Sequence, residues 1–274
     1  MPDPKFTVST LGVPYDDSSS FLRGAAQAPN AIREAFRSPS SNTCCEAGFD
    51  LDQHPYLTDA GDLAFEPGGD PFERIETAVG ELLDAGNRVL TLGGDHAIAY
   101  PILEAYGRRF ERLTLLQLDA HPDLYDELDG NYRSHACPFA RIMEDGLVAR
   151  LVQVGIRTLN PHQRMQAERF DVEIIDMRQW RPDAVPELEA PLYLSLDLDV
   201  LDPAFAPGVS HHEPGGLSVR EVIRIIQDLA GPVVGADLVE LNPTRDPTGV
   251  TAMVAAKLYK EIAGKMLEPL GTSV

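Results

Sequence analysis

Short runs rich in Val, Leu and Ile alternate with longer amphipathic stretches along this chain of 274 residues. Short apolar runs are typical of parallel strands buried on both faces, and amphipathic stretches between them are typical of helices. The alternation predicts one α/β domain over residues 1–274, a single three-layer domain with a mainly parallel β-sheet flanked by helices. The predicted strands are 5–11, 88–92, 113–118, 151–155, 172–175, 191–196 and 232–238. The predicted helices are 71–85, 101–110, 137–144, 161–169 and 218–229.

The charge of the chain restricts its partners. It has 43 acidic and 23 basic residues and a formal net charge of -20, which disfavours nucleic acid and favours cationic ligands or metals. No apolar run approaches the ~18 residues of a membrane span. Residues 1–5 do not resemble the start of a targeting segment, so we expect a cytoplasmic protein with no membrane partner. Cys44, Cys45 and Cys137 form no C-x-x-C pair and are expected to be reduced thiols.

Polar clusters follow four of the predicted strands. "GGDH" follows 88–92, "DAHPD" follows 113–118, "DLDVLDP" follows 191–196, and "ADLVELNP" follows the start of 232–238. Ligands of parallel sheets bind beyond the carboxyl ends of the strands. The clusters are therefore expected to meet at one edge of the sheet and to form its functional site.

The spacing of carboxylates in these clusters favours a metal site. Asp119 and His121 are two residues apart, as are Asp197 and Asp199, so each pair projects from one face of an extended chain. Buried aspartates on one face repel each other unless a cation compensates them. Each pair alone also fits an ordinary cap or turn, but their repetition at successive strand ends favours metal binding.

The whole set of candidate ligands is a mixture of imidazoles and carboxylates. Such nitrogen and oxygen ligands suit Mn²⁺ better than a thiolate-rich set would. Six of them suffice for two metal ions when carboxylates bridge. The candidates are His96, Asp119, His121, Asp123, Asp197 and Asp199.

The sequence resembles the ureohydrolases, the superfamily of arginases and agmatinases. "GGDHAIAYP", "DAHPD" and "SLDLDVLDPAFAPG" resemble its three signature motifs in order and spacing. The resemblance covers nearly the whole chain, and "DAHPDLYD", "GVSHHEPGGLS" and "GVTAMVAAKL" are most similar to plant-type arginases. It implies an arginase-like fold, two Mn²⁺ per chain, a homotrimer or homohexamer, and hydrolysis of a small cationic guanidino substrate to urea and an amine.

The resemblance also implies how the ligands are shared between the ions. One manganese would be held by His96, Asp119, Asp123 and Asp197, and the other by Asp119, His121, Asp197 and Asp199. Asp95 and Asp237 are then expected to support the site from behind, Asp237 near Glu240. Asp202 is expected to anchor the turn before Pro203.

Two further residues receive catalytic roles from the resemblance. Glu240 would pair with the guanidinium, and His135 would pass a proton to the leaving amine. From the residues alone, Glu240 could also be an exposed strand-end carboxylate and His135 a helix-start residue. His211 and His212 are adjacent in an extended stretch, point to opposite sides, and are left outside the metal set.

The substrate expected from the resemblance is L-arginine, which would give L-ornithine and urea. Asn131, Arg133 and Ser134 are candidate partners of its carboxylate, and Asn160 stands where animal-type arginases have an Asp for the amine. Agmatine or another guanidino compound is the alternative substrate. A two-metal phosphoesterase is disfavoured because the metal loops have few basic residues. A protein that only binds metals is a further alternative.

Overall fold

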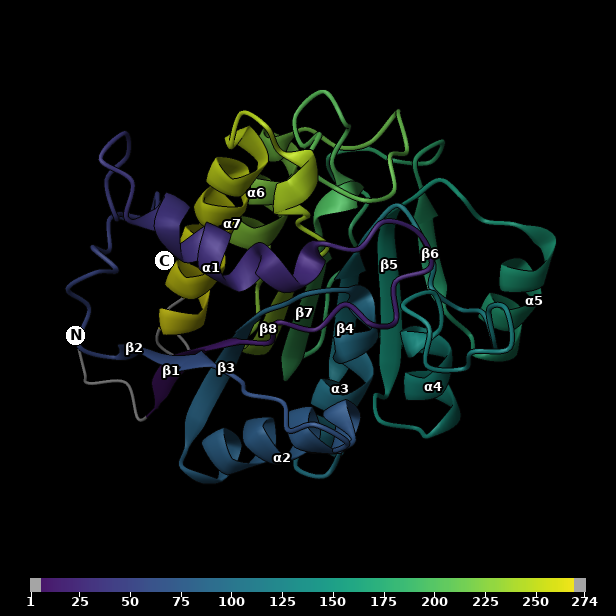
Figure 1. Cartoon of the computed structure of the whole chain (residues 1–274). Coiled ribbons are helices and arrows are strands. Elements are labelled where there is room, and N and C mark those ends of the chain that lie inside the picture. Colours follow the sequence, from purple (N-terminus) through teal and green to yellow (C-terminus); the bar gives the residue numbers. More distant parts are fainter. Residues whose placement is uncertain (1–5, 269–274) are drawn as a thin grey trace.

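A parallel sheet forms the centre of the computed structural model, which describes residues 6–268 (Figure 1). Its eight strands within these residues run in the order β2-β1-β3-β8-β7-β4-β5-β6, and neighbouring strands pair in parallel throughout. The strands are β1 Thr7–Gly12, β2 Leu57–Asp62, β3 Asn87–Leu92, β4 Thr114–Leu118, β5 Arg150–Ile156, β6 Glu173–Asp176, β7 Leu192–Asp197 and β8 Val233–Val239.

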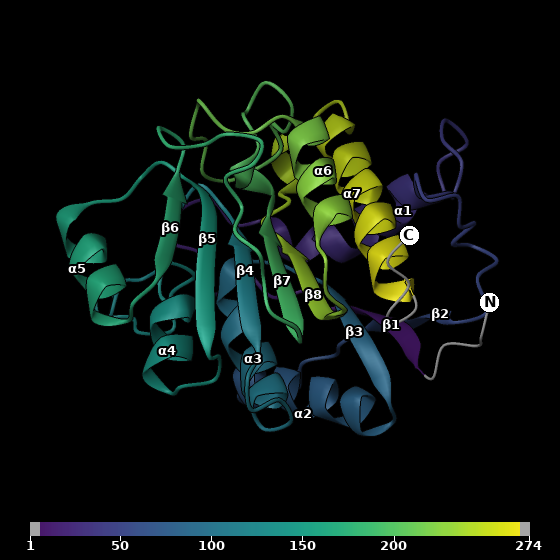
Figure 2. The same cartoon turned by 180° about the vertical axis from the view of Figure 1, so that it is seen from behind.

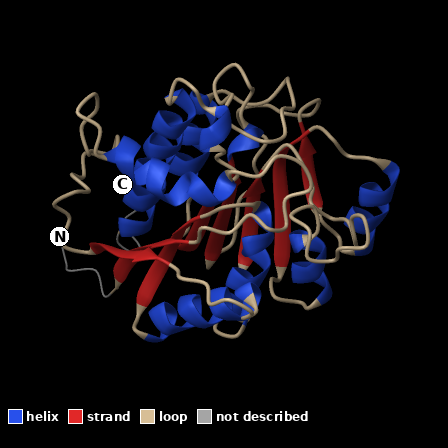
Figure 3. Cartoon of the chain, viewed as in Figure 1, coloured by secondary structure: helices blue, strands red, loops and turns tan. Residues whose placement is uncertain are grey.

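Helices cover both faces of the sheet, as Figures 2 and 3 show. One face carries α1 Ala28–Phe36, α6 Val219–Asp228 and α7 Val250–Leu267, and the other carries α2 Pro71–Asp84, α3 Ala99–Gly107 and α4 Pro138–Glu144. The helix α5 Pro161–Arg169 lies beside the β6 end of the sheet. A separate buried apolar cluster fills each helix–sheet interface, which confirms the predicted three-layer α/β architecture.

The starts of several helices follow directly from the sequence. Asp70 precedes Pro71, and its side chain accepts a hydrogen bond from the backbone N–H of Phe72. Ser218 and Glu221 form a reciprocal capping box at the start of α6. Proline pre-forms the first helical turn, and a side-chain oxygen satisfies an otherwise unpaired N–H. These signals explain why the predicted helix starts are accurate to within about two residues.

The predicted elements are all found, but one strand and two α-helices of the described residues were missed. The predicted strand 5–11 corresponds to β1, although Lys5 lies outside the described residues. The expectation about targeting rests on residues 1–5, which also lie outside them. The strand β2 and the helices α1 and α7 were not predicted. β2 has the sequence LTDAGD and lies at the sheet edge, mostly exposed. α7 is buried on most sides, so its apolar residues do not form a single helical stripe.

The sheet order gathers the four polar clusters. The clusters follow β3, β4, β7 and β8, and these strands are adjacent in the order β3-β8-β7-β4. Because all four strands are parallel, their carboxyl ends lie at the same edge of the sheet. Within residues 6–268, no helix is both long enough and apolar enough to cross a membrane.

Candidate functional site

The loop after β3 carries His96 into the centre of the molecule. A Cβ atom on Gly94 would lie 1.7 Å from the carbonyl oxygen of Tyr15, so this position requires glycine. The same carbonyl accepts a hydrogen bond from the backbone N–H of Asp95. The Asp95 side chain then caps the short 3₁₀ turn His96–Ile98 by accepting from the N–H of Ala97. Gly94 therefore allows a close backbone approach that fixes His96.

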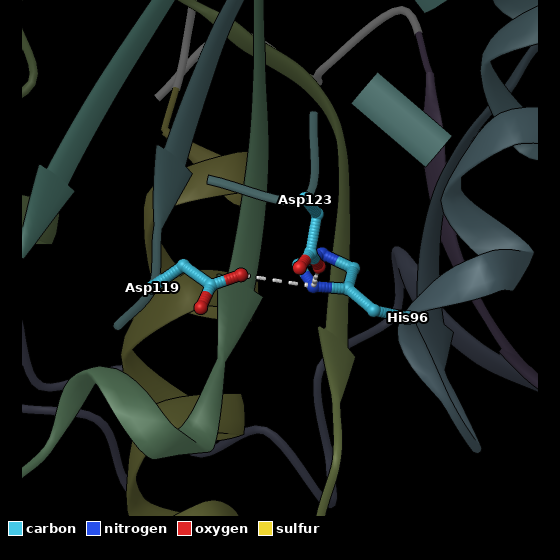
Figure 4. A group of neighbouring side chains, drawn as sticks. All are labelled: His96, Asp119 and Asp123. Atoms are coloured by element: carbon cyan, nitrogen blue, oxygen red, sulfur yellow. Dashed lines mark ion pairs between the residues drawn. The ribbon is translucent and has the colours of Figure 1, made fainter. Parts of the chain in front are cut away.

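Three carboxylates surround the His96 imidazole. Its Nδ1 atom lies 3.0 Å from Asp119 Oδ2 and 3.2 Å from both Asp123 Oδ2 and Asp197 Oδ2. Figure 4 shows the side chains of His96, Asp119 and Asp123 pointing toward one another. Their ligand atoms lie close enough to hold a single metal ion. All four side chains are almost fully buried.

A second group of candidate ligands shares Asp119 with the first. His121 Nδ1 lies 2.9 Å from Asp199 Oδ2 and 3.5 Å from Asp119 Oδ1. These three side chains also offer ligand atoms at the spacing that one metal ion requires. Asp199 stands in the 3₁₀ turn Leu198–Val200 directly after β7, and Asp119 follows β4. The structure thus brings together all six predicted ligands, and Asp119 belongs to both groups.

The polar atoms of this region fit divalent cations. His96 Nδ1 is buried and forms no hydrogen bond with any residue from 6 to 268, although it faces three carboxylates. Burial lowers the pKa of His96, but the neighbouring carboxylates of Asp119, Asp123 and Asp197 outweigh burial and raise it. Burial and the charge of Asp119 raise the pKa of Asp123 to about 6. A positive charge is therefore favoured among these side chains, and a bound metal ion would supply one.

A buried hydrogen-bonded chain holds the other nitrogen of His96. Nε2 lies 2.9 Å from Ser195 Oγ, which donates to Asp237 Oδ1 at 2.7 Å. Tyr193 donates to the second oxygen of Asp237 at 2.8 Å. Since the Ser195 hydroxyl donates to Asp237, it can accept from His96 Nε2–H, which leaves Nδ1 as the free electron-pair donor. Asp237 therefore contacts Ser195 and Tyr193 and supports His96 through the Ser195 hydroxyl.

The predicted proton shuttle and the predicted guanidinium partner are in contact. His135 Nδ1 lies 2.8 Å from Glu240 Oε1, and the same oxygen accepts the backbone N–H of His96 at 3.0 Å. Burial lowers the pKa of His135, but Glu240 outweighs burial and raises it to about 9. His135 Nε2 lies 2.8 Å from the hydroxyl of Ser20. Glu240 has a positive φ of 64°, a backbone conformation that is uncommon for such a residue and often found at functional sites.

These residues line one cavity of about 190 Å³. Its wall includes the candidate ligands His121, Asp123, Asp197 and Asp199, together with His135 and Glu240. The wall is completed by side chains to which sequence reasoning gave no role, among them Ser20, Tyr125, Thr158, Gln163 and His211. None of the described residues in this wall is a lysine or an arginine.

The two adjacent histidines have different surroundings. The ring centroid of His211 lies 5.1 Å from that of His135 and 5.8 Å from that of His121. His212 is exposed, and its Nε2 contacts the carbonyl of Pro207. The prediction that neighbouring residues point to opposite sides is confirmed. His211 faces the cavity.

The predicted contacts for the distal end of the substrate lie outside the cavity wall. Asn131 is exposed, and Arg133 forms an ion pair with Asp70 at 2.9 Å. Ser134 is buried and accepts from the N–H of Ala136. Asn160 caps α5. The roles assigned to these four residues stay predictions that the geometry does not support directly.

The turn residue Asp202 has the role expected from the sequence. Its side chain accepts hydrogen bonds from the N–H groups of Ala204, Gly215 and Gly216. These bonds hold the segment after β7 against the segment that leads to α6. Asp202 therefore anchors its turn and belongs to neither group of candidate ligands.

Comparison with known proteins gives consistent results. The sequence pattern that describes the arginase family matches residues 6–264. The chain is 47% identical over 280 residues to "Arginase 1, mitochondrial" of Arabidopsis thaliana, covering 96% of this chain and 82% of that protein. It is 36% identical over 270 residues to "Agmatinase" of Neisseria meningitidis serogroup C, covering 92% of this chain and 84% of that protein. The solved structure "Arginase from Medicago truncatula" superimposes with a TM-score of 0.91 at 45% identity, covering 95% of this chain and 87% of that one.

Proposed function

The chain belongs to the arginase family, and we propose that it hydrolyses L-arginine to L-ornithine and urea. The observation that supports this most directly is the contact between His135 and Glu240 in a cavity that also presents four candidate metal ligands. A carboxylate that receives a cation, a histidine that can move a proton, and a binding place for divalent cations are then within reach of one small substrate.

The proposed cofactors are two Mn²⁺ ions per chain. His96, Asp119, Asp123 and Asp197 would hold one ion, and Asp119, His121, Asp197 and Asp199 the other. The buried, unpaired Nδ1 of His96 supports this assignment, as does the mixed imidazole and carboxylate set, which suits manganese. When bound, such ions supply a nucleophile at neutral pH and offset charge that develops on the substrate.

The protein residues orient the substrate and handle a proton. The Glu240 carboxylate is buried and accepts from His135 and from the backbone of His96, so its orientation is fixed before a substrate arrives. A guanidinium is planar and cationic, and a carboxylate is its natural partner. The imidazole of His135 contacts Glu240 through Nδ1 and Ser20 through Nε2. It can pass a proton to the amine as the carbon–nitrogen bond breaks.

Agmatine is the second candidate substrate. The described wall of the cavity contains no lysine or arginine that would pair with an α-carboxylate, and agmatine differs from arginine in lacking that group. The greater similarity to the plant arginases than to the agmatinase favours arginine. Neutral hydrogen-bond donors in the wall are able to hold a carboxylate without a cation.

Urea release from the purified full-length chain tests the proposal. The protein is loaded with MnCl₂ and assayed with arginine, agmatine and a phosphate monoester, before and after treatment with a chelator. We expect urea from arginine with a higher kcat/KM than from agmatine, loss of activity on chelation, and recovery with Mn²⁺. A preference for agmatine would assign agmatinase activity. Metal-dependent melting without urea release would leave only a metal-binding role.

Two properties proposed from the sequence remain to be measured. A homotrimer or homohexamer is proposed, and light scattering coupled to size-exclusion chromatography measures the mass directly. A cytoplasmic location is also proposed, although the Arabidopsis relative is named mitochondrial. Cell fractionation with an antibody against the chain distinguishes the two locations.

A further inference from the structure

One hydroxyl group in the cavity wall has a fixed hydrogen-bond polarity. The side chain of Asn160 caps α5, where its Oδ1 accepts the backbone N–H of Gln163 at 2.9 Å. An amide oxygen must occupy that position, because a backbone N–H is only a donor. The amide NH₂ of Asn160 therefore faces Tyr125, and it donates to the Tyr125 hydroxyl.

This arrangement leaves the Tyr125 hydrogen available. The NH₂ group of Asn160 cannot accept, so the hydroxyl oxygen of Tyr125 is the acceptor in this bond. No other hydrogen bond of this hydroxyl is found within residues 6–268, and Tyr125 lines the cavity. Its ring stacks on that of His162, with centroids 5.5 Å apart and planes 13° apart. The ring is thus held in place while the O–H group is directed to donate.

We propose that the Tyr125 hydroxyl, oriented by Asn160, donates a hydrogen bond to an acceptor at the distal end of the substrate. It would thereby favour a substrate with a carboxylate at that end over one that lacks it. This inference rests on the proposed hydrolysis of guanidino compounds and specifies how the same site distinguishes arginine from agmatine. Tyr125 follows the candidate ligand Asp123 by two residues, and both side chains line the same cavity. A cationic group would gain nothing from a hydroxyl held as a donor, whereas a carboxylate gains a charge-assisted hydrogen bond.

Tyr125→Phe is the direct test, because it removes the hydroxyl and retains the ring that stacks on His162. We expect kcat/KM for arginine to fall on the order of tenfold to a hundredfold, mainly through KM. The value for agmatine is expected to stay within about twofold, because agmatine has no carboxylate to lose a partner. Tyr132→Phe is the matched control: it removes a hydroxyl from an exposed tyrosine of the same loop that does not line the cavity.

Asn160→Asp tests the orienting role separately. Aspartate caps a helix as well as asparagine does, but its second oxygen would accept from Tyr125 and turn the hydroxyl hydrogen away from the cavity. We expect the same loss of arginine preference as in Tyr125→Phe, and little further loss when the two substitutions are combined. If Asn160→Asp lowered the arginine preference by the same factor in the unmodified chain and in the Tyr125→Phe variant, the coupling between Asn160 and Tyr125 would be overturned.

The possible outcomes separate this inference from the proposed function. Suppose that the unmodified chain releases urea from arginine, but Tyr125→Phe lowers kcat/KM equally for both substrates or for neither. The role of Tyr125 is then wrong, and the arginase function stands. If the unmodified chain releases urea from neither compound, the function itself is wrong. Calorimetric binding of L-ornithine and putrescine to the manganese-loaded protein provides a readout without turnover. Tyr125→Phe should weaken the binding of ornithine and leave the binding of putrescine unchanged.

Discussion

The Nδ1 atom of His135 lies 2.8 Å from the Oε1 atom of Glu240, although 105 positions separate them in the sequence. The same Glu240 oxygen accepts the backbone N–H of His96. A candidate metal ligand, a candidate guanidinium partner and a candidate proton shuttle are therefore linked through one carboxylate oxygen. Because Glu240 Oε1 already holds two partners before substrate binds, the orientation of the carboxylate costs little to establish during catalysis.

Replacing His135 should separate proton transfer from metal binding. His135→Ala is expected to lower kcat on the order of a hundredfold, the usual effect of removing a general acid. The manganese content should stay unchanged, since His135 belongs to neither group of candidate ligands. Metal analysis and steady-state kinetics on the same preparation measure both quantities. His212→Ala, which removes an exposed imidazole outside the cavity, is the matched control. A His135 variant that loses manganese would make His135 a ligand.

The two groups of ligands predict unequal effects on the two ions. Asp199→Asn should weaken the ion near His121 more than the ion near His96, because Asp199 Oδ2 lies 2.9 Å from His121 Nδ1 and belongs only to that group. Removing one carboxylate charge lowers the affinity for a hard cation. Calorimetric titration of the apoprotein with Mn²⁺ resolves the two steps. Asp202→Asn, a change in the nearby turn, should leave both steps intact. An equal loss of both ions would contradict the assignment.

The fold was predictable because buried parallel strands carry a strong apolar signal. The strand β7, with the sequence LYLSLD, is buried along its whole length, whereas β2 is a mostly exposed edge strand with two aspartates. Periodicity reports burial, so it predicts central strands and misses edges. β2 is fixed by partners distant in sequence, including Arg33 of α1, which pairs with Asp59 and Asp62. A local sequence pattern does not predict such a contact.

The candidate ligands were predictable for a related reason. Their spacing at strand ends is local, and parallel strands bring those ends together. The cavity wall was not predictable, because Ser20, Tyr125 and His211 come from loops whose paths depend on long-range contacts. The path of the loop that carries Ser20, for example, is fixed where the backbone N–H of His135 donates to the carbonyl of Ser18. Position in the sequence likewise does not reveal that Arg133 pairs with Asp70 and lies outside the cavity wall.

The close approach at Gly94 gives a prediction about the metal site. Gly94→Ala would place a Cβ atom 1.7 Å from the Tyr15 carbonyl oxygen, so the backbone that positions His96 must move. We expect a loss of about 1–3 kcal/mol in the free energy of unfolding together with weaker binding of Mn²⁺. Gly69→Ala is the control, because its nearest contact would be an ordinary 3.4 Å. Denaturant unfolding and metal titration provide the two readouts. Unchanged metal affinity would show that the loop position is not what fixes His96.

The link between α1 and β2 predicts a pH-dependent stability. Burial raises the pKa of Asp59, but the hydrogen bond from Arg33 outweighs burial and lowers it. A depressed folded-state pKa contributes stability above the unfolded-state value, and this contribution disappears as the pH falls through the folded-state pKa. Asp59→Asn should therefore cost about 0.5–1 kcal/mol at pH 7, a modest value because Asp59 is partly exposed. The difference from the unmodified chain should vanish in acid. Denaturant unfolding at several pH values measures it, with Asp52→Asn as control. A difference that persists in acid would exclude the ion pair as its cause.

The final prediction concerns Arg133, which the sequence suggested as a partner of the substrate carboxylate. Its guanidinium contacts both oxygens of Asp70 at 2.9 and 3.0 Å and lies 4.7 Å from the ring centroid of Phe72. It does not line the cavity, and releasing it would break an ion pair at the start of α2. Arg133→Ala should therefore lower the free energy of unfolding by about 0.5–1 kcal/mol and leave the ratio of kcat/KM for arginine to that for agmatine unchanged. Kinetics with both substrates show whether Arg133 contacts the substrate or only pairs with Asp70, and Tyr125→Phe is measured alongside. A fall in the ratio of about tenfold or more, the loss expected for a charge-assisted hydrogen bond, would return Arg133 to the substrate site.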